Sequence, residues 1–151
     1  MINIETKIPP PIVGLIFGIL INYTKDIFPN LEIKNDNLLG IFTIIVGLVC
    51  ILSAINLFKK YKTTITPLNP SSATNLITNG IYKFSRNPMY LGMLLILAGI
   101  SIIVNPIGGF LLMLIFLTYI NKFQIIPEEK AMTDLFKDEF LEYKEKVRRW
   151  I

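Results

Sequence analysis

Four long apolar blocks, with most charged residues gathered between and after them, constrain the fold of this chain more than any other feature. The blocks run from about Pro11 to Phe28, Asn37 to Phe58, Pro88 to Val104 and Ile107 to Phe123. Hydrophobic residues make up 52% of the 151 residues, charged residues only 17%, and the mean hydropathy is +0.55. A soluble core does not need unbroken apolar runs, whereas a bilayer does. The sequence therefore predicts an all-α fold, a polytopic membrane helix bundle with about four transmembrane helices in a single domain, residues 1–151.

The boundaries of the blocks predict how the helices connect. The second block reaches about 30 Å as a helix, which is a full hydrocarbon thickness. Only Asn105 and Pro106 separate the third and fourth blocks, so we expect a tight helical hairpin there. After Pro127, apolar residues recur three and four positions apart from Met132 to Val147. This spacing predicts a C-terminal amphipathic helix that lies on the membrane surface or packs on the domain.

The charges at the two ends of this last helix have a simple explanation in the helix dipole. Glu128 and Glu129 at its start would complement the positive pole, and basic residues such as Arg149 near its end would complement the negative pole. This explanation competes with any functional role of the two glutamates.

Lysine and arginine are distributed unevenly over the predicted loops. The segment between the second and third blocks and the tail after the fourth are rich in both, whereas the first connection has only Lys25 and Lys34, offset by acidic residues. By the positive-inside rule, both termini and the long central loop should face the cytoplasm. The net charge of +4 then lies mainly where anionic lipid is expected, so we expect no nucleic-acid partner.

Two residue types limit the chemistry. Histidine is absent, and Cys50 is the single cysteine, in the middle of an apolar block. The chain therefore lacks the commonest zinc ligand, the usual near-neutral proton shuttle and a disulfide framework. We expect no metal.

The predicted topology brings polar side chains from three segments to one membrane surface. An arginine can pair with a carboxylate, a glutamate can bind an ammonium group or ribose hydroxyls, and a tyrosine can face a base or a sulfonium. Together they predict a cytoplasm-facing pocket for a ligand that is both charged and aromatic, although each residue alone could serve as a topology anchor, an interfacial aromatic or a helix start. The expected neighbours are Arg86, Asn87, Tyr90, Gln124, Glu128 and Glu129.

The stretch NLITNGIYKFSRNPMYLG, followed about 40 residues later by a glutamate pair and then by F-x3-F-x2-Y, resembles the isoprenylcysteine carboxyl methyltransferase family and its phospholipid-methyltransferase relatives. The resemblance covers roughly Pro67 to the C-terminus. It implies a membrane helix bundle that binds S-adenosylmethionine on its cytoplasmic side without a Rossmann domain, with the cofactor region at residues 67–90 and 124–151. Matching positions imply cofactor contacts at Thr74, Asn75, Leu76, Ile77, Tyr82, Asn87, Pro88, Met89, Tyr90 and Glu128, and catalytic roles for Arg86, Glu128 and Glu129.

Two departures from the family pattern bear on the methyl acceptor. Asn87 stands where eukaryotic members usually have histidine. Gln124 stands where the prenylcysteine enzymes carry an arginine linked to the substrate, and glutamine is a poorer partner for a carboxylate. Gln124 is nevertheless the candidate substrate-binding residue.

The resemblance implies methyl transfer from S-adenosylmethionine to a lipophilic acceptor that enters from the bilayer. An isoprenylcysteine-like carboxylate needs no general base, whereas an amine, as in phospholipid N-methylation, must lose a proton to Glu128, Glu129 or Tyr90. Two other readings stay open: a membrane enzyme related to sterol reductases that binds NADPH, and a non-catalytic membrane scaffold.

Overall fold

The computed structural model describes residues 5–29, 31, 33, 35–63 and 70–151, and this part of the chain is helical with no strand. Two short 3-10 turns, Pro70–Ser72 and Gly80–Lys83, lie in the loop before α3, and a π-helical segment, Asn121–Ile125, follows α4. The α-helices are α1 Pro10–Tyr23, α2 Asp36–Lys60, α3 Pro88–Val104, α4 Pro106–Ile120 and α5 Ile126–Lys146.

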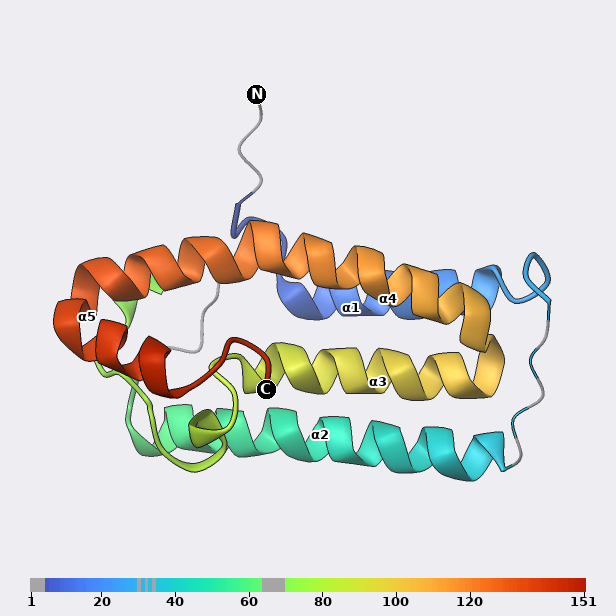
Figure 1. The fold of residues 1–151 in the computed structure, drawn as a ribbon, viewed down its shortest axis with the longest axis horizontal. Helices are drawn as coiled ribbons and strands as arrows, with labels where there is room; N and C mark the ends of the chain where they lie inside the picture. The colour runs from blue at the N-terminus through green and yellow to red at the C-terminus, as the bar shows by residue number, and fades with distance from the viewer. Residues whose placement is uncertain (1–4, 30, 32, 34, 64–69) are drawn as a thin grey trace.

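The bundle is organised around α3, which packs against α1, α2 and α4 (Figure 1). Glycines allow α2 and α3 to approach closely: a Cβ on Gly92 would lie 2.6 Å from the carbonyl oxygen of Gly47, and a Cβ on Gly47 would meet Gly92 in the same way. Small residues are the usual means of close helix packing in membranes. The fold is thus a helical membrane bundle, as the apolar blocks predict.

The predicted hairpin between the third and fourth blocks is confirmed. Asn105 is buried between α3 and α4, and its side-chain oxygen accepts a hydrogen bond of 3.0 Å from the backbone N–H of Gly108. Its Nδ2 donates to the carbonyl oxygen of Thr24 at 3.1 Å, which ties the end of α1 to the hairpin. Pro106 then occupies the first position of α4, where no N–H donor is needed.

Two helical runs are long and apolar enough to cross a membrane: α2, and Pro106–Lys146, which begins with α4 and includes α5. Helices α1 and α3 are apolar but shorter, with 14 and 17 residues. The first helix ends at Tyr23 rather than near Phe28: the chain turns after Thr24, whose hydroxyl donates to the carbonyl oxygen of Leu20 at 2.9 Å. The number of spans and their orientation stay predictions.

The C-terminal helix differs from the prediction in one respect. It does not start afresh after Pro127, because α4 passes through the π-helical segment directly into α5. Glu128 and Glu129 therefore do not sit at a free helix start, and the explanation by the helix dipole is wrong for them. At Lys137 the backbone is not helical (φ 45°, ψ −120°), and α5 turns back toward the start of α3 (Figure 1).

Candidate functional site

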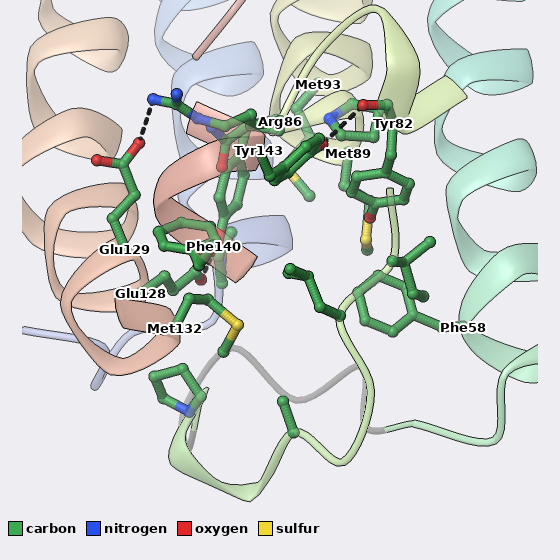
Figure 2. Close-up of a pocket in the computed structure, with 18 of the residues that line it drawn as sticks. Phe58, Tyr82, Arg86, Met89, Met93, Glu128, Glu129, Met132, Phe140 and Tyr143 are labelled. Atoms are coloured by element: carbon green, nitrogen blue, oxygen red, sulfur yellow. Dashed lines mark hydrogen bonds and ion pairs between the residues drawn. The ribbon is translucent and has the colours of Figure 1, made fainter. Parts of the chain in front are cut away.

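A cavity of about 260 Å³ lies at the end of the bundle where α3 and α5 begin. Its walls come from the end of α2, the loop with the two 3-10 turns, the first turns of α1 and α3, and both arms of α5. Most of the lining is apolar, with a few polar groups that converge on one side (Figure 2). A small concave site of this composition is typical of ligand binding.

Arg86 stands at the polar side of this cavity, just before α3. Its NH2 group pairs with Glu129 at 2.8 Å, and its NH1 group donates to the carbonyl oxygens of Lys144 and Val147 at 3.1 and 2.9 Å. Its Nε is buried and has no hydrogen-bond partner in the described part of the chain. A buried donor without a partner is costly, so this atom is an unsatisfied donor of a residue that lines the cavity.

Glu128 and Tyr90 form the second polar pair of the cavity. The Tyr90 hydroxyl donates a short hydrogen bond to the Glu128 carboxyl. Burial raises the pKa of Glu128 to about 7, the hydrogen bond from Tyr90 opposes this rise, and the charge of Glu129 adds to it. A carboxyl with a pKa near neutrality can exchange a proton at working pH, which is the property that a general acid or base needs.

Glu129, the next residue, has the opposite environment. Besides Arg86, it accepts hydrogen bonds from Arg149 Nε and NH2 at 3.0 and 2.8 Å. Burial alone would raise its pKa, but the hydrogen bonds and charges of Arg149 and Arg86 outweigh that effect and hold the pKa below its usual value. Glu129 therefore stays ionised and is fully occupied by protein cations.

Aromatic and sulfur side chains form the rest of the wall. The rings of Phe58 and Tyr82 meet edge to face with centroids 6.0 Å apart, and the Tyr143 hydroxyl donates to the carbonyl oxygen of Tyr82 at 2.7 Å. Met89 lies near Tyr82, and Phe140 lies beside Glu128 on the opposite side (Figure 2). Such a wall suits a flat ring or a cationic sulfur centre.

Most of the residues predicted for the site lie together. Gly80 has a positive φ of 61°, a conformation that favours glycine, in the turn that leads to Tyr82. The cavity is lined by ten of the predicted residues, namely Leu76, Ile77, Tyr82, Arg86, Asn87, Pro88, Met89, Tyr90, Glu128 and Glu129.

Three predicted residues do not line the cavity. Thr74 and Asn75 are exposed, and the Asn75 amide donates to the carbonyl oxygen of Tyr61 at 2.9 Å. Gln124 is fully buried in the π-helical segment, where its Nε2 donates to the carbonyl oxygen of Ile8 at 2.9 Å. The first part of the predicted cofactor region, residues 67–69, lies outside the described residues.

Sequence reasoning missed several wall residues and one charged residue. Phe140 and Tyr143 belong to the F-x3-F-x2-Y pattern, whose spacing placed them on one helix face but not in the cavity. The sequence predicts Arg149 near the end of the last helix. The helix instead ends at Lys146, and the tail folds back to bring Arg149 to Glu129.

A second hollow, an apolar groove of about 600 Å³, lies between α1, α2 and α3. Gly14 and Gly18 line it from α1, and a Cβ on Gly14 would meet no atom within 4 Å. Pro11 and Met93 line both the groove and the cavity. The apolar groove therefore adjoins the cavity that contains Arg86 and Glu128.

Comparison with known proteins identifies a family. The model of the family described as phospholipid methyltransferase matches residues 36–139. A Haemophilus influenzae protein described as uncharacterized is 43% identical over 63 residues, which cover 42% of this chain and 100% of that protein. Protein-S-isoprenylcysteine O-methyltransferase of Saccharomyces cerevisiae is 36% identical over 76 residues, which cover 48% of this chain but 30% of the yeast protein. No solved structure matches.

The matched region includes α2, α3 and both halves of the polar side of the cavity, from Arg86 to Glu129. It stops before the C-terminal tail that carries Arg149. The predicted resemblance is confirmed by a match over more than half of the chain: the protein belongs to the phospholipid methyltransferase family, a family of membrane methyltransferases.

Proposed function

We propose that this protein transfers a methyl group from S-adenosylmethionine to a lipophilic acceptor at the cytoplasmic face of the membrane. One observation carries the proposal: a cavity with a proton-labile carboxyl, an unpartnered arginine donor and an aromatic wall adjoins an apolar groove. A polar cofactor and a lipid-like acceptor can meet only at such a boundary. We further propose that residues 67–90 and 124–151 form the cofactor region.

The residues present in the cavity suit this cofactor. When bound, S-adenosylmethionine supplies an electrophilic methyl group on a sulfonium centre. Arg86 Nε offers a buried donor for a carboxylate, Tyr82 offers a ring face, and ionised Glu128 offers a counter-charge for a cationic group. The protein's main task in a displacement at carbon is to align the two reactants, and a rigid pocket between packed helices supports that alignment.

The acceptor's lipid chain fits the groove lined by Gly14 and Gly18, with its polar end directed toward Met93 and the cavity. A carboxylate acceptor, such as the isoprenylcysteine type named in the yeast relative, needs no base. An amine acceptor, as in phospholipid N-methylation, needs one, and Glu128 with a pKa of about 7 suits that role. Gln124 takes no part in this scheme, because its amide holds Ile8.

We propose that α1, α2, α3 and α4 all span the membrane, with both termini and the cavity on the cytoplasmic side. The apolar lengths of α2 and of the helical run Pro106–Lys146, which begins with α4, support two of the spans, and the lysine and arginine distribution supports the orientation. Single-cysteine variants of a Cys50→Ser protein, labelled from either side of sealed vesicles, test this topology. Labelling at residue 59 from the cytoplasmic side and at residue 26 from the opposite side is expected.

Binding of S-adenosylmethionine to the detergent-purified protein, measured by calorimetry with NADPH alongside, tests the function. Glu128→Gln keeps the shape of the side chain but removes the carboxylate, and it is expected to weaken binding. Glu139→Gln, on the exposed part of α5, is the matched control and should bind like the wild type. NADPH binding instead would favour the reductase reading. A folded protein that binds neither would favour the scaffold.

A further inference from the structure

We propose that Arg149 is a positioning residue: it docks the C-terminal tail, residues 147–150, onto the Arg86-Asn87-Pro88 motif and thereby fixes both halves of the candidate cofactor site. The proposal rests on the function proposed above, because it concerns the same cavity. Arg149 does not line that cavity, so it acts through Glu129 and Arg86.

The tail joins two segments that are more than 40 residues apart in the sequence. The backbone N–H of Arg86 donates to the carbonyl oxygen of Arg148 at 3.1 Å, and Asn87 Nδ2 donates to that of Arg149 at 3.0 Å. The Ser85 hydroxyl donates to the same Arg149 oxygen at 3.4 Å. On the other side, the Arg149 guanidinium holds Glu129 through two hydrogen bonds. The tail is therefore a bridge between the motif before α3 and the first turn of α5.

Among the described residues of the tail, Arg149 alone forms an ion pair with Glu129. Glu129 is 13% exposed and Arg86 is 11% exposed, whereas Arg149 is 35% exposed. The bidentate geometry fixes the plane of the Glu129 carboxylate, and Arg86 meets one of the same oxygens. A lysine, which offers a point charge, cannot reproduce this geometry.

Fixing Glu129 also fixes its neighbour. Glu128 and Glu129 are consecutive residues of one helical turn, so the rotation that places Glu129 against the two arginines directs Glu128 to Tyr90. Released from Arg149, Glu129 would keep only Arg86, and the tail would keep its backbone hydrogen bonds and the side-chain packing of Val147 and Trp150 but no link to Glu129. The cavity would then lose the alignment of Arg86 with Glu128 on which cofactor binding depends.

Trp150 gives a direct signal of tail docking. It is the single tryptophan of the chain, and it packs against the cluster of buried residues that includes Tyr90. Its fluorescence therefore reports whether the tail is docked, without any ligand. Release of the tail exposes the indole to water and moves the emission to longer wavelength.

The experiment compares four full-length variants in detergent: Arg149→Met, Arg149→Lys, Glu129→Gln and Arg149→Met with Glu129→Gln. Arg148→Met is the matched control, because it removes the same charge from an exposed neighbour and keeps the backbone acceptor. Trp150 emission is read first, and S-adenosylmethionine affinity second. Arg149→Met should move the emission to longer wavelength and weaken binding on the order of tenfold, with an intermediate effect for Arg149→Lys.

In the Glu129→Gln background, Arg149→Met should add little, because the two residues act through one contact. Equal and additive losses in the two backgrounds would overturn the proposal, as would unchanged emission and affinity in Arg149→Met. A variant that only unfolds at lower temperature, with wild-type emission and affinity, would also overturn it by showing a merely structural role. If the wild type binds no S-adenosylmethionine, the proposed function fails, and the emission series still tests the docking.

Discussion

Two adjacent residues in the first turn of α5, Glu128 and Glu129, place their carboxyl groups in opposite environments. Glu129 faces two arginines, has a lowered pKa and is fully used in holding the protein together. Glu128 faces the cavity and Tyr90, and its pKa is raised to about 7. The comparison teaches that a glutamate pair in a sequence need not be a pair of equivalent catalytic groups. One can anchor the wall while the other remains free to exchange a proton.

Removing the anchoring carboxyl should have the largest effect. Glu129→Ala leaves Arg86 and Arg149 without a counter-charge, and the loss of one partner of a buried ion pair costs about 3 kcal/mol of unfolding free energy. Reversible unfolding of the detergent-purified protein measures this cost. Glu142→Ala removes a carboxylate whose ion pair is exposed, so it serves as the control and should change stability little. Equal costs for the two variants would contradict the division of roles.

The next largest effect is expected in the pH dependence of stability, where the carboxyl groups of Glu128 and Glu129 should act in opposite directions. Because the Glu128 pKa is raised in the folded state to about 7, the folded protein binds a proton more tightly there. Its contribution to stability is full below about pH 4.5 and is lost as pH rises through about 7. Glu129 has the opposite sign: its contribution is present above about pH 4.5 and is lost as pH falls through its lowered pKa.

Thermal unfolding between pH 5 and pH 8 measures the first of these contributions. The wild-type unfolding temperature should fall over that range, and Glu128→Gln should remove part of the fall. Glu129→Gln should lower the unfolding temperature at both pH values. A fall that is unchanged in Glu128→Gln would mean that another group titrates.

A smaller effect is expected from the hydrogen bond in the cavity. Tyr90→Phe removes the hydroxyl that stabilises ionised Glu128, at a cost of about 1 kcal/mol. Since that hydrogen bond lowers the Glu128 pKa, its loss should move the pH midpoint of S-adenosylmethionine binding upward. Calorimetry over a pH series measures the midpoint. Tyr23→Phe is the control, because Tyr23 is exposed at the end of α1.

The sequence predicts the starts of α1, α3 and α4 well because each of these boundaries has a local cause. Proline at the start of α1, α3 and α4, and the Asn105-Pro106 break, fix those ends through backbone chemistry alone. The continuity of α4 into α5 has no such local sign, since a proline one residue into α5 reads equally well as a new start. The return of the tail to Glu129 depends on the turn at Lys137, which no residue pattern announces.

The residues of the site can be divided in the same way, into those that the sequence places correctly and those that it does not. Residues of the Arg86-Asn87-Pro88 stretch and the glutamate pair reach the cavity because the hairpin of α3 and α4 returns the chain to one end of the bundle. Gln124 does not line the cavity because it lies in the π-helical segment. A π-turn takes more residues per turn than an α-helix, and the side chain faces the N-terminal segment at Ile8.

The smallest effect is expected at Asn75. This variant tests whether Asn75 contacts the cofactor, as the family resemblance implies, or lies outside the site, as in the structure. Matching positions make Asn75 a cofactor contact, whereas the structure has it exposed, outside the cavity, with its amide on the carbonyl oxygen of Tyr61. Asn75→Ala should therefore change stability by less than about 0.5 kcal/mol and leave S-adenosylmethionine affinity unchanged in calorimetry, whereas Ile77→Ala, on the cavity wall, should weaken it. A loss of affinity in Asn75→Ala would mean that the loop closes on the ligand and brings this amide in. The first turn of α5, which is anchored through Glu129, would then be the fixed surface against which the loop closes.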